Sequence, residues 1–385
     1  MTAIRKSVVF GRESKFKGGA SDWIAPPPGT FISCGHNRTT SRINTTGSKT
    51  FDTMGFGQMT GSWEWSYTFD YDYLEPLLLA FEKYSCEPVT DENGKETGMY
   101  KHTFSKANNY RVGSFCIREK VLNVMAGGPE GSDEMVDRYG AVVKTIRFNK
   151  TSAEGPISVT QNGFYCDEKM QKGELTGTDF TVYGGHLAEF MCMFIGDEAT
   201  ADNYVAMTET LNVSLENNAS AIPITCTPFA GGYHEGLTQI AFSTTAYSND
   251  PSRYKQRVYS GGFDNTALRP MSKNMAPIKR MILKSYNATV RDADGNIDLE
   301  KSIAGSTRSV TFIIDDCVIK SLTWQKGDGS KLQDQISSAE CRNLTIEVVN
   351  DISDITKTNH HKVTSNAPGS TTTVENPVTG EDDTA

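Results

Sequence analysis

Residues 62–69 read SWEWSYTF, and their large and small side chains alternate strictly along the chain. The aromatic side chains of this stretch share one face: Trp63, Trp65, Tyr67 and Phe69. A period of two is typical of a β-strand with one buried face. The stripe therefore favours the core of a sheet, and the alternative is a platform on which sugar rings stack.

The sequence on either side of this strand predicts a helix and a long loop or hairpin. Residues 73–81 read YLEPLLLAF, which predicts a short helix with an apolar face and with Pro76 in its first turn. Before the strand, residues 37–57 are rich in Thr, Ser and Gly and predict a long mobile loop or a hairpin. Further strands are predicted at residues 114–119, 140–148 and 157–163.

Two similar stretches, one in each half of the chain, indicate an internal repeat. Residues 141–149 (AVVKTIRFN) align with residues 317–325 (CVIKSLTWQ). Other elements follow in the same order when they are aligned by eye: Gly61 and Trp63 with Gly236 and Thr238, 74–81 with 251–259, 114–117 with 309–314, and 157–160 with 343–349. We therefore expect two tandem β-rich domains, 1–175 and 176–355, each with a short flanking helix.

Composition narrows the class of protein. The chain has 385 residues, 37% of them apolar, and a formal net charge of −9. It is long enough for two cores, and the acidic balance disfavours a surface that grips nucleic acid. We expect neither a membrane-spanning helix nor a secretory leader, because no apolar run is long enough. Residues 356–385 are almost devoid of apolar side chains, so a flexible polar tail is expected there.

The cysteines and histidines offer little that resembles a metal or catalytic site. The eight cysteines are scattered without a C-x-x-C pair, which favours buried free thiols: Cys34, Cys86, Cys116, Cys166, Cys192, Cys226, Cys317 and Cys341. Cys34 and His36 could supply two metal ligands, but no second pair has matching spacing. His360 and His361 fall in the polar tail, where we expect them to be solvated. No nucleophile, phosphate-loop or dinucleotide motif is present, so no enzyme activity, cofactor or resident metal is predicted.

Acidic residues give weaker hints of chemistry. Residues 292–300 read DADGNIDLE and resemble a calcium loop, but the Gly stands fourth rather than sixth, which favours a hairpin over a weak cation site. The pairs Asp70/Asp72 and Asp315/Asp316 could act as glycosidase carboxylates; the preferred interpretation is a solvated face.

The order of the elements resembles the tail tube proteins of long-tailed bacteriophages. The likeness rests on Gly61-Ser62-Trp63-Glu64-Trp65 with the helix that follows, and on the strands within residues 100–167. The second half follows the same plan more loosely, so the resemblance covers about residues 1–350. The long 86–101 and 263–308 inserts, the Cys and Met content and the polar tail depart from the usual pattern.

The resemblance implies a mainly β fold with two tandem sandwich or half-barrel units that join edge to edge into a ring. Stacked rings would form a hollow tube in the virion tail, assembled in the host cytoplasm, through which DNA passes without sequence-specific binding. Two units in each chain imply a trimeric ring with pseudo-hexameric symmetry, and loop 37–57 is expected to reach a neighbouring ring. An acidic chain also suggests a negatively charged channel wall, which would repel phosphates.

Two other functions remain open at this point. The chain could be another ring component of the tail, such as a tip, terminator or baseplate protein. It could also be a carbohydrate-binding β-protein, for which the aromatic stripe is the main argument.

Overall fold

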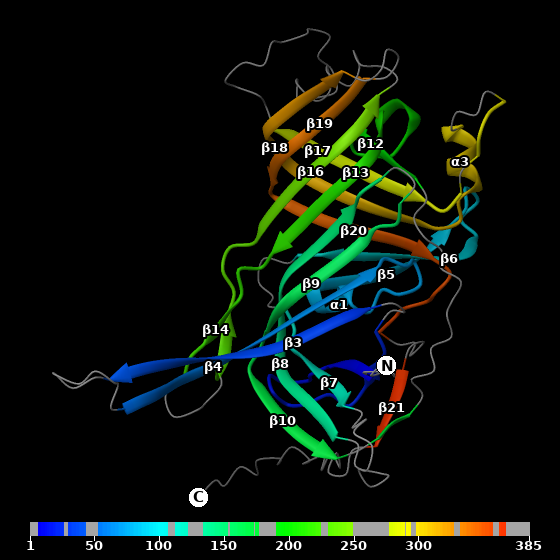
Figure 1. Ribbon diagram of the computed structural model, residues 1–385. Coiled ribbons are helices and arrows are strands. Elements are labelled where there is room, and N and C mark those ends of the chain that lie inside the picture. Colours follow the sequence, from blue (N-terminus) through cyan, green and yellow to red (C-terminus); the bar gives the residue numbers. More distant parts are fainter. Residues whose placement is uncertain are drawn as a thin grey trace, which may run out of the picture.

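The protein is mainly β and is built around a large antiparallel sheet (Figure 1). The computed structural model describes residues 7–26, 30–43, 53–106, 112–121, 134–152, 155–172, 174–176, 190–224, 230–248, 277–288, 290–293, 298–326, 332–356 and 362–366. The expected fold class, mainly β with little helix, is confirmed.

A first set of strands fills the N-terminal half of the chain: β1 (Ser7–Arg12), β2 (Trp23–Ile24), β3 (Phe31–Ile43), β4 (Thr53–Thr68), β7 (Phe115–Val121), β8 (Glu134–Lys150), β9 (Ser158–Tyr165) and β10 (Asp167–Lys172). In this first strand set, β4 pairs with β3 and β9, and β8 pairs with β9, β10 and β7. β7 in turn pairs with β1. The predicted strands at 114–119, 140–148 and 157–163 are thus present, and β8 is longer than its prediction at both ends.

A second set of strands follows: β12 (Phe190–Ile195), β13 (Tyr204–Glu216), β16 (Gln239–Ser248), β17 (Ile278–Tyr286), β18 (Ser309–Lys326), β19 (Leu332–Cys341) and β20 (Asn343–Asn350). In this second strand set, β16 pairs with β13 and β19, and β18 pairs with β19, β20 and β17. β17 pairs with β12, and β12 pairs back with the start of β13. Apart from the β12–β13 pairing, which has no counterpart among the described residues of the first set, the two sets use the same order of pairing along the chain.

Local irregularities also recur at matching places in the two sets. The β8·β9 ladder shifts register between Val143 and Thr145, and the β18·β19 ladder shifts between Ile319 and Ser321 and again between Ser321 and Leu322. Just before these shifts, Gly140 has φ +61° and Asp316 has φ +50°, the left-handed region. These two residues directly precede the aligned stretches 141–149 and 317–325, so both long strands have a left-handed residue at the same distance before their register shift.

The ladders correct the other alignments that the sequence predicts. Trp63 lies opposite Gly163 and Phe242 lies opposite Ala339, so Trp63 matches Phe242 rather than Thr238. By its pairing β7 corresponds to β17 and not to 309–314, and β9 corresponds to β19 and not to 343–349. Similar apolar runs occur in every buried strand, so sequence similarity alone does not identify which strands of the two halves correspond. The predicted helix at 251–259 lies outside the described residues.

The remaining elements are shorter. A hairpin of β5 (Lys83–Thr90) and β6 (Glu96–Ser105) joins the second strand set through β20. The other elements are β11 (Glu174–Thr176), β14 (Ser220–Ile222), β15 (Gly232–His234), β21 (Lys362–Asn366), the helices α1 (Leu77–Ala80) and α3 (Leu299–Gly305), and the 3-10 turn η1 (Ala201–Asn203). The predicted helix at 73–81 is thus a single turn, and all four of its residues are buried.

The predicted polar tail is partly a strand. Residues 362–366 form β21, which pairs with β2 and β11. Backbone hydrogen bonds do not need apolar side chains, so a polar segment can pair wherever a strand edge is open. Residues 367–385 lie outside the described part of the chain.

The aromatic stripe forms the core of the first strand set. The exposed fractions of Trp63, Trp65, Tyr67 and Phe69 are 2%, 1%, 4% and 1%. The Trp65 indole N–H donates to Gln161 Oε1 at 2.9 Å, and Gln161 is itself fully buried. The alternative of a sugar-stacking platform is therefore wrong, because these faces are covered by other side chains.

Candidate functional site: an internal seam and two open strand edges

The two strand sets meet through one ladder, which we call the internal seam. It joins β8 to β13 from Lys150 opposite Leu211 to Thr145 opposite Glu216. The apolar side chains along the seam are fully or almost fully buried: Leu211, Val213 and Leu215 from β13, Ile146 and Phe148 from β8. The seam thus combines main-chain pairing with a continuous apolar core.

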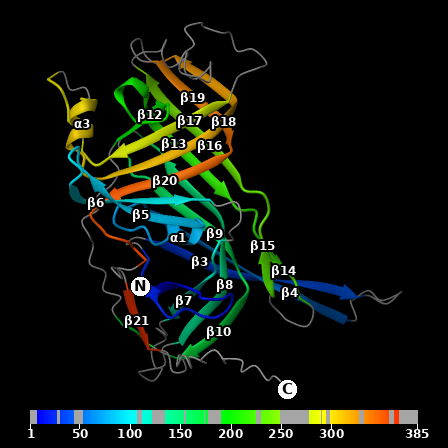
Figure 2. The same ribbon diagram turned by 180° about the vertical axis from the view of Figure 1, so that it is seen from behind.

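A short arm strengthens the seam. β14 and β15 pair with each other beyond the end of β13, and this pair of strands lies beside the first strand set (Figure 2). The Tyr233 hydroxyl donates to the Val112 carbonyl at 2.6 Å, and the Tyr233 ring lies 5.4 Å from the Phe16 ring. Val142 of β8 belongs to the small apolar cluster at this contact and is fully buried.

The long hairpin of β3 and β4 corresponds to this arm by register. Ser41 lies opposite Gly55, and Ser220 lies opposite His234, in the same alignment that matches Trp63 with Phe242. In Figure 1 the β3–β4 hairpin projects away from the rest of the molecule. The predicted loop or hairpin at 37–57 is therefore a hairpin where it is described, and residues 44–52 lie outside the described residues.

The strands that correspond to the seam have open edges. Within the described residues, β3 pairs only with β4, and residues 321–326 of β18 pair only with β19. Ile32 and Cys34 on β3 are half-buried, and His36 is exposed. Val318, which matches the buried Val142, is 47% exposed. These edges carry unsatisfied main-chain groups that another strand could pair with.

Lys150 at the end of the seam is a buried amine. Its side chain is covered and donates to the Gly155 carbonyl. Burial lowers the pKa of Lys150 from its usual 10.5 to about 8. Burial therefore makes the Lys150 amine easier to deprotonate than usual, although at pH 7 it still carries its proton for most of the time.

We predict that Lys150→Met raises the free energy of unfolding by an amount that depends on pH. Between about pH 10.5 and 8 the unfolded chain binds a proton that the folded chain excludes, so stability falls as the pH is lowered and levels off below about 8. The difference in unfolding free energy between Lys150→Met and the wild type should therefore shrink as the pH rises from 8 to 10.5. Urea titrations at several pH values measure it, with half-exposed Lys144→Met as the control. A difference that stays constant with pH would contradict the prediction.

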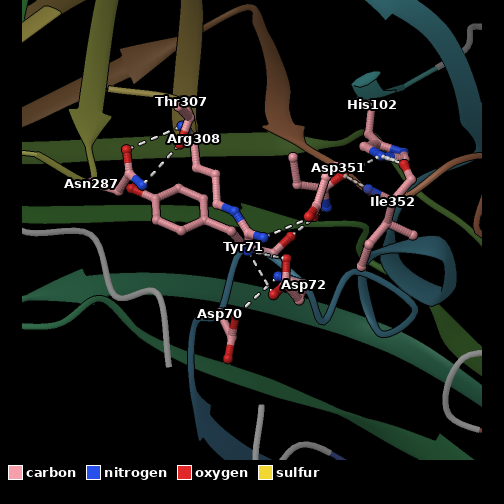
Figure 3. A network of polar contacts seen from close by, with 10 residues as sticks. Asp70, Tyr71, Asp72, His102, Asn287, Thr307, Arg308, Asp351 and Ile352 are labelled. Atoms are coloured by element: carbon pink, nitrogen blue, oxygen red, sulfur yellow. Dashed lines mark hydrogen bonds and ion pairs between the residues drawn. The ribbon is translucent and has the colours of Figure 1, made fainter. Parts of the chain in front are cut away.

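Of the acidic pairs named from sequence, Asp72, Asp315 and Asp316 form ion pairs, and Asp70 accepts a hydrogen bond from the Asp72 backbone N–H at 2.9 Å. Arg308 Nη1 lies 2.5 and 2.6 Å from the two Asp72 oxygens, and Arg308 Nη2 lies 2.8 Å from Asp351 Oδ1 (Figure 3). Asp72 is only 9% exposed, so the expectation of a solvated face is wrong for it. Asp315 pairs with Arg280 at 2.7 Å, and Asp316 pairs with Arg342 at 3.2 Å. The buried Asp72–Arg308 pair ties the two strand sets, whereas the Asp316–Arg342 pair is largely exposed to solvent.

Residues 292–300 do not form the predicted hairpin where they are described. Asp298 caps helix α3, since its side chain accepts a hydrogen bond from the Lys301 N–H at 3.0 Å. An Asp at this position satisfies a free N–H of the first turn. Asp294 and Gly295 lie outside the described residues.

The metal candidates do not gather into a site. Among the described residues no cluster of three or more His, Cys, Asp or Glu side chains could hold a metal ion. His360 and His361 lie outside the described residues. Cys116, Cys166, Cys192 and Cys317 are buried free thiols, as predicted, and Cys34, Cys86 and Cys341 are only half-buried. Burial raises the pKa of Cys166 to about 11, which keeps it as a thiol at neutral pH.

Two buried polar networks were not foreseen from the sequence. Arg118 and Asp137 form a bidentate ion pair with both distances at 2.6 Å, and the Arg118 guanidinium lies 4.1 Å from the Trp23 ring centroid. Elsewhere His102, which is fully buried, receives a hydrogen bond from the Tyr84 hydroxyl at Nδ1 and donates from Nε2 to Asn350 Oδ1, both at 2.9 Å. The first pair could have been suspected from the alternation of β7 and β8. Nothing in the sequence marks His102 and Asn350, which lie 248 residues apart.

His102 makes stability depend on pH in the acid range. Burial lowers the pKa of His102 below its usual 6.5, although hydrogen bonds to Asn350 and Ile352 and the charges of Asp354 and Glu75 oppose the shift. As the pH falls below about 6.5 the unfolded chain gains a proton that the folded chain excludes, so stability should fall. We predict that His102→Gln, which is less stable at pH 7.5, loses less stability between pH 7 and 5 than the wild type. Urea unfolding at both pH values measures this, with exposed His234→Gln as the control; equal losses in wild type and His102→Gln would contradict it.

Comparison with known proteins adds no identification. The sequence matches no protein-family model and no curated protein. Among the described residues, no helix has the length and apolar character to cross a membrane.

Proposed function

We propose that this chain is a structural protein that joins copies of itself into rings, and that stacked rings form the tail tube of a long-tailed bacteriophage. The observation that carries the proposal is the internal seam between β8 and β13. The strands that match these two, β18 and β3, each have an edge that pairs with no other strand among the described residues. A seam that repeats head to tail from one unit to the next generates a ring when the rotation closes.

The matched ladders support two units in each chain. Three chains would then present six similar units, and the ring would have trimeric symmetry with a pseudo-hexameric wall. The ring would surround a channel in which Asp and Glu outnumber Lys and Arg, so that DNA slides through without sticking. The burial of the aromatic stripe removes the main argument for a carbohydrate-binding protein.

Electron microscopy of the purified full-length chain tests the proposal. Over a range of protein concentrations we expect rings or tubes with three chains in each ring. Six chains in each ring, or a channel wall with net positive charge, would overturn the symmetry or the channel argument. Particles that stay monomeric at every concentration would overturn self-assembly itself.

Copy number separates the tube from another tail ring. A tube protein occurs in many stacked rings, whereas a tip, terminator or baseplate ring occurs in few. We expect purified particles to contain this chain among their most abundant proteins. A single ring in each particle would instead assign it to one end of the tail.

A further inference from the structure

The internal seam predicts how one copy of the chain pairs with the next. We propose that residues 32–37 of β3 pair antiparallel with residues 321–326 of β18 in a second copy of this chain, with Cys34 opposite Trp324. The inference rests on the proposed self-association and names the strands and the register that produce it.

The register follows from two alignments within the chain. The β3–β4 hairpin aligns with β13–β16, because Cys34 faces Trp63 as Val213 faces Phe242. The second half of β8 aligns with that of β18, because both strands have one extra residue at the same place, between Val143 and Thr145 and between Ile319 and Ser321, and Phe148 thereby matches Trp324. The further shift between Ser321 and Leu322 comes from an extra residue on β19, which the β16·β19 ladder also shows, and it leaves this alignment unchanged. In the internal seam Val213 lies opposite Phe148. Their counterparts are Cys34 and Trp324.

Two other positions along this seam can be compared: one becomes more polar, and the other is conserved. Leu215 opposite Ile146 becomes His36 opposite Leu322. Leu211 opposite Lys150 becomes Ile32 opposite Lys326, so the lysine at the end of the seam recurs. Ile32, Cys34 and Leu322 are half-buried in the single chain, although their counterparts in the internal seam are fully or almost fully covered. A second copy would cover them.

Val318 supplies an independent observation. It is one of the few large apolar side chains that stand exposed among the described residues, at 47%. Its counterpart Val142 is fully buried, in the cluster where the β14–β15 arm rests on the first strand set. The β3–β4 hairpin matches that arm. A neighbour whose β3 pairs with β18 would therefore bring its hairpin toward Val318, which accounts for an apolar side chain left in water.

A cross-link tests the register. The native Cys34 should form a disulfide with a cysteine placed opposite it, so Trp324→Cys should give covalently linked chains on non-reducing gels after mild oxidation with copper and dioxygen. Gln325→Cys is the matched control, because successive positions of a strand alternate between its two faces and position 325 should not react. Trp324→Cys combined with Cys34→Ser should also stay unlinked. Efficient linkage of Gln325→Cys, or none of Trp324→Cys in rings that form normally, would overturn the register and leave the proposed function standing.

Two separate substitutions, Val318→Asp and Val142→Asp, test the proposed contact surface around Val318 without a cross-link. Val318→Asp should fold with an unchanged urea midpoint and weaken association by about tenfold or more, since a carboxylate would be buried at the contact. Val142→Asp should instead destabilise the single chain. Met170→Asp, a similar change at a 67% exposed site on β10, serves as the control and should assemble normally. Val318→Asp rings as stable as those of the wild type would overturn the proposed surface, and wild-type chains that never associate would overturn the proposed function instead.

Discussion

Arg308→Met is expected to lower the free energy of unfolding by about 3 kcal/mol, because breaking a buried ion pair leaves one charge without compensation. The charge left behind is that of Asp72, which is only 9% exposed and loses both of its short contacts to the guanidinium. Because Asp72 belongs to the first half of the chain and Arg308 to the second, the loss should also loosen the contact between the strand sets. Urea unfolding followed by tryptophan fluorescence measures it.

Asp351→Asn provides the matched control for this prediction. Asp351 binds the same guanidinium at 2.8 Å, but its side chain is 57% exposed. A solvated ion pair contributes only about 0–1 kcal/mol, so this variant should unfold close to the wild type. If Arg308→Met and Asp351→Asn cost the same small amount, the buried pair does not stabilise the join between the strand sets.

Trp65→Ala is expected to cost about 4 kcal/mol, because removing a buried tryptophan leaves a cavity that the sheet cannot close. The Trp65 ring centroid lies 5.2 Å from that of Phe10, 5.1 Å from that of Trp63 and 5.7 Å from that of Phe115. The same change would leave the buried Gln161 Oε1 without its indole donor.

Two further variants divide the cost of losing Trp65. Trp65→Phe keeps most of the ring volume but loses the indole N–H, so it should cost about 1–3 kcal/mol. Leu237→Ala, at a residue that is 88% exposed, should change the free energy of unfolding by less than about 0.5 kcal/mol. Chemical denaturation of all three variants measures these differences. A Trp65→Ala cost below about 1 kcal/mol would mean that the aromatic stripe is not the core of the first strand set.

Local patterns predicted the strands well, because their information lies within a few residues. The alternation at Trp63 to Phe69 required one buried face, and burial followed. Pairing partners were harder, since register depends on residues far apart in the chain. The sequence pattern aligns Trp63 with Thr238, whereas the strand pairing matches Trp63 with Phe242.

Buried polar groups were missed for the same reason. His102 is polar in an ordinary strand, and only the approach of β20 and Asn350 gives it a partner and removes its water. Asp72 seemed solvated because Arg308 lies 236 residues away along the chain. The open edges of β3 and β18 were equally invisible, because an edge is defined by the strands that do not pair with it.

The internal seam also has a kinetic consequence. A tether holds the two strand sets at an effective concentration that separate molecules reach only in the millimolar range. Half of the joints in the proposed ring would thus form during folding, before any encounter between chains, and without the loss of translational freedom that each encounter costs. In the joint that remains, the exposed His36 stands where the internal seam has the buried Leu215, so this joint has less apolar surface to cover. Newly made chains would therefore stay dispersed for longer, and closure would respond to their concentration in the cell.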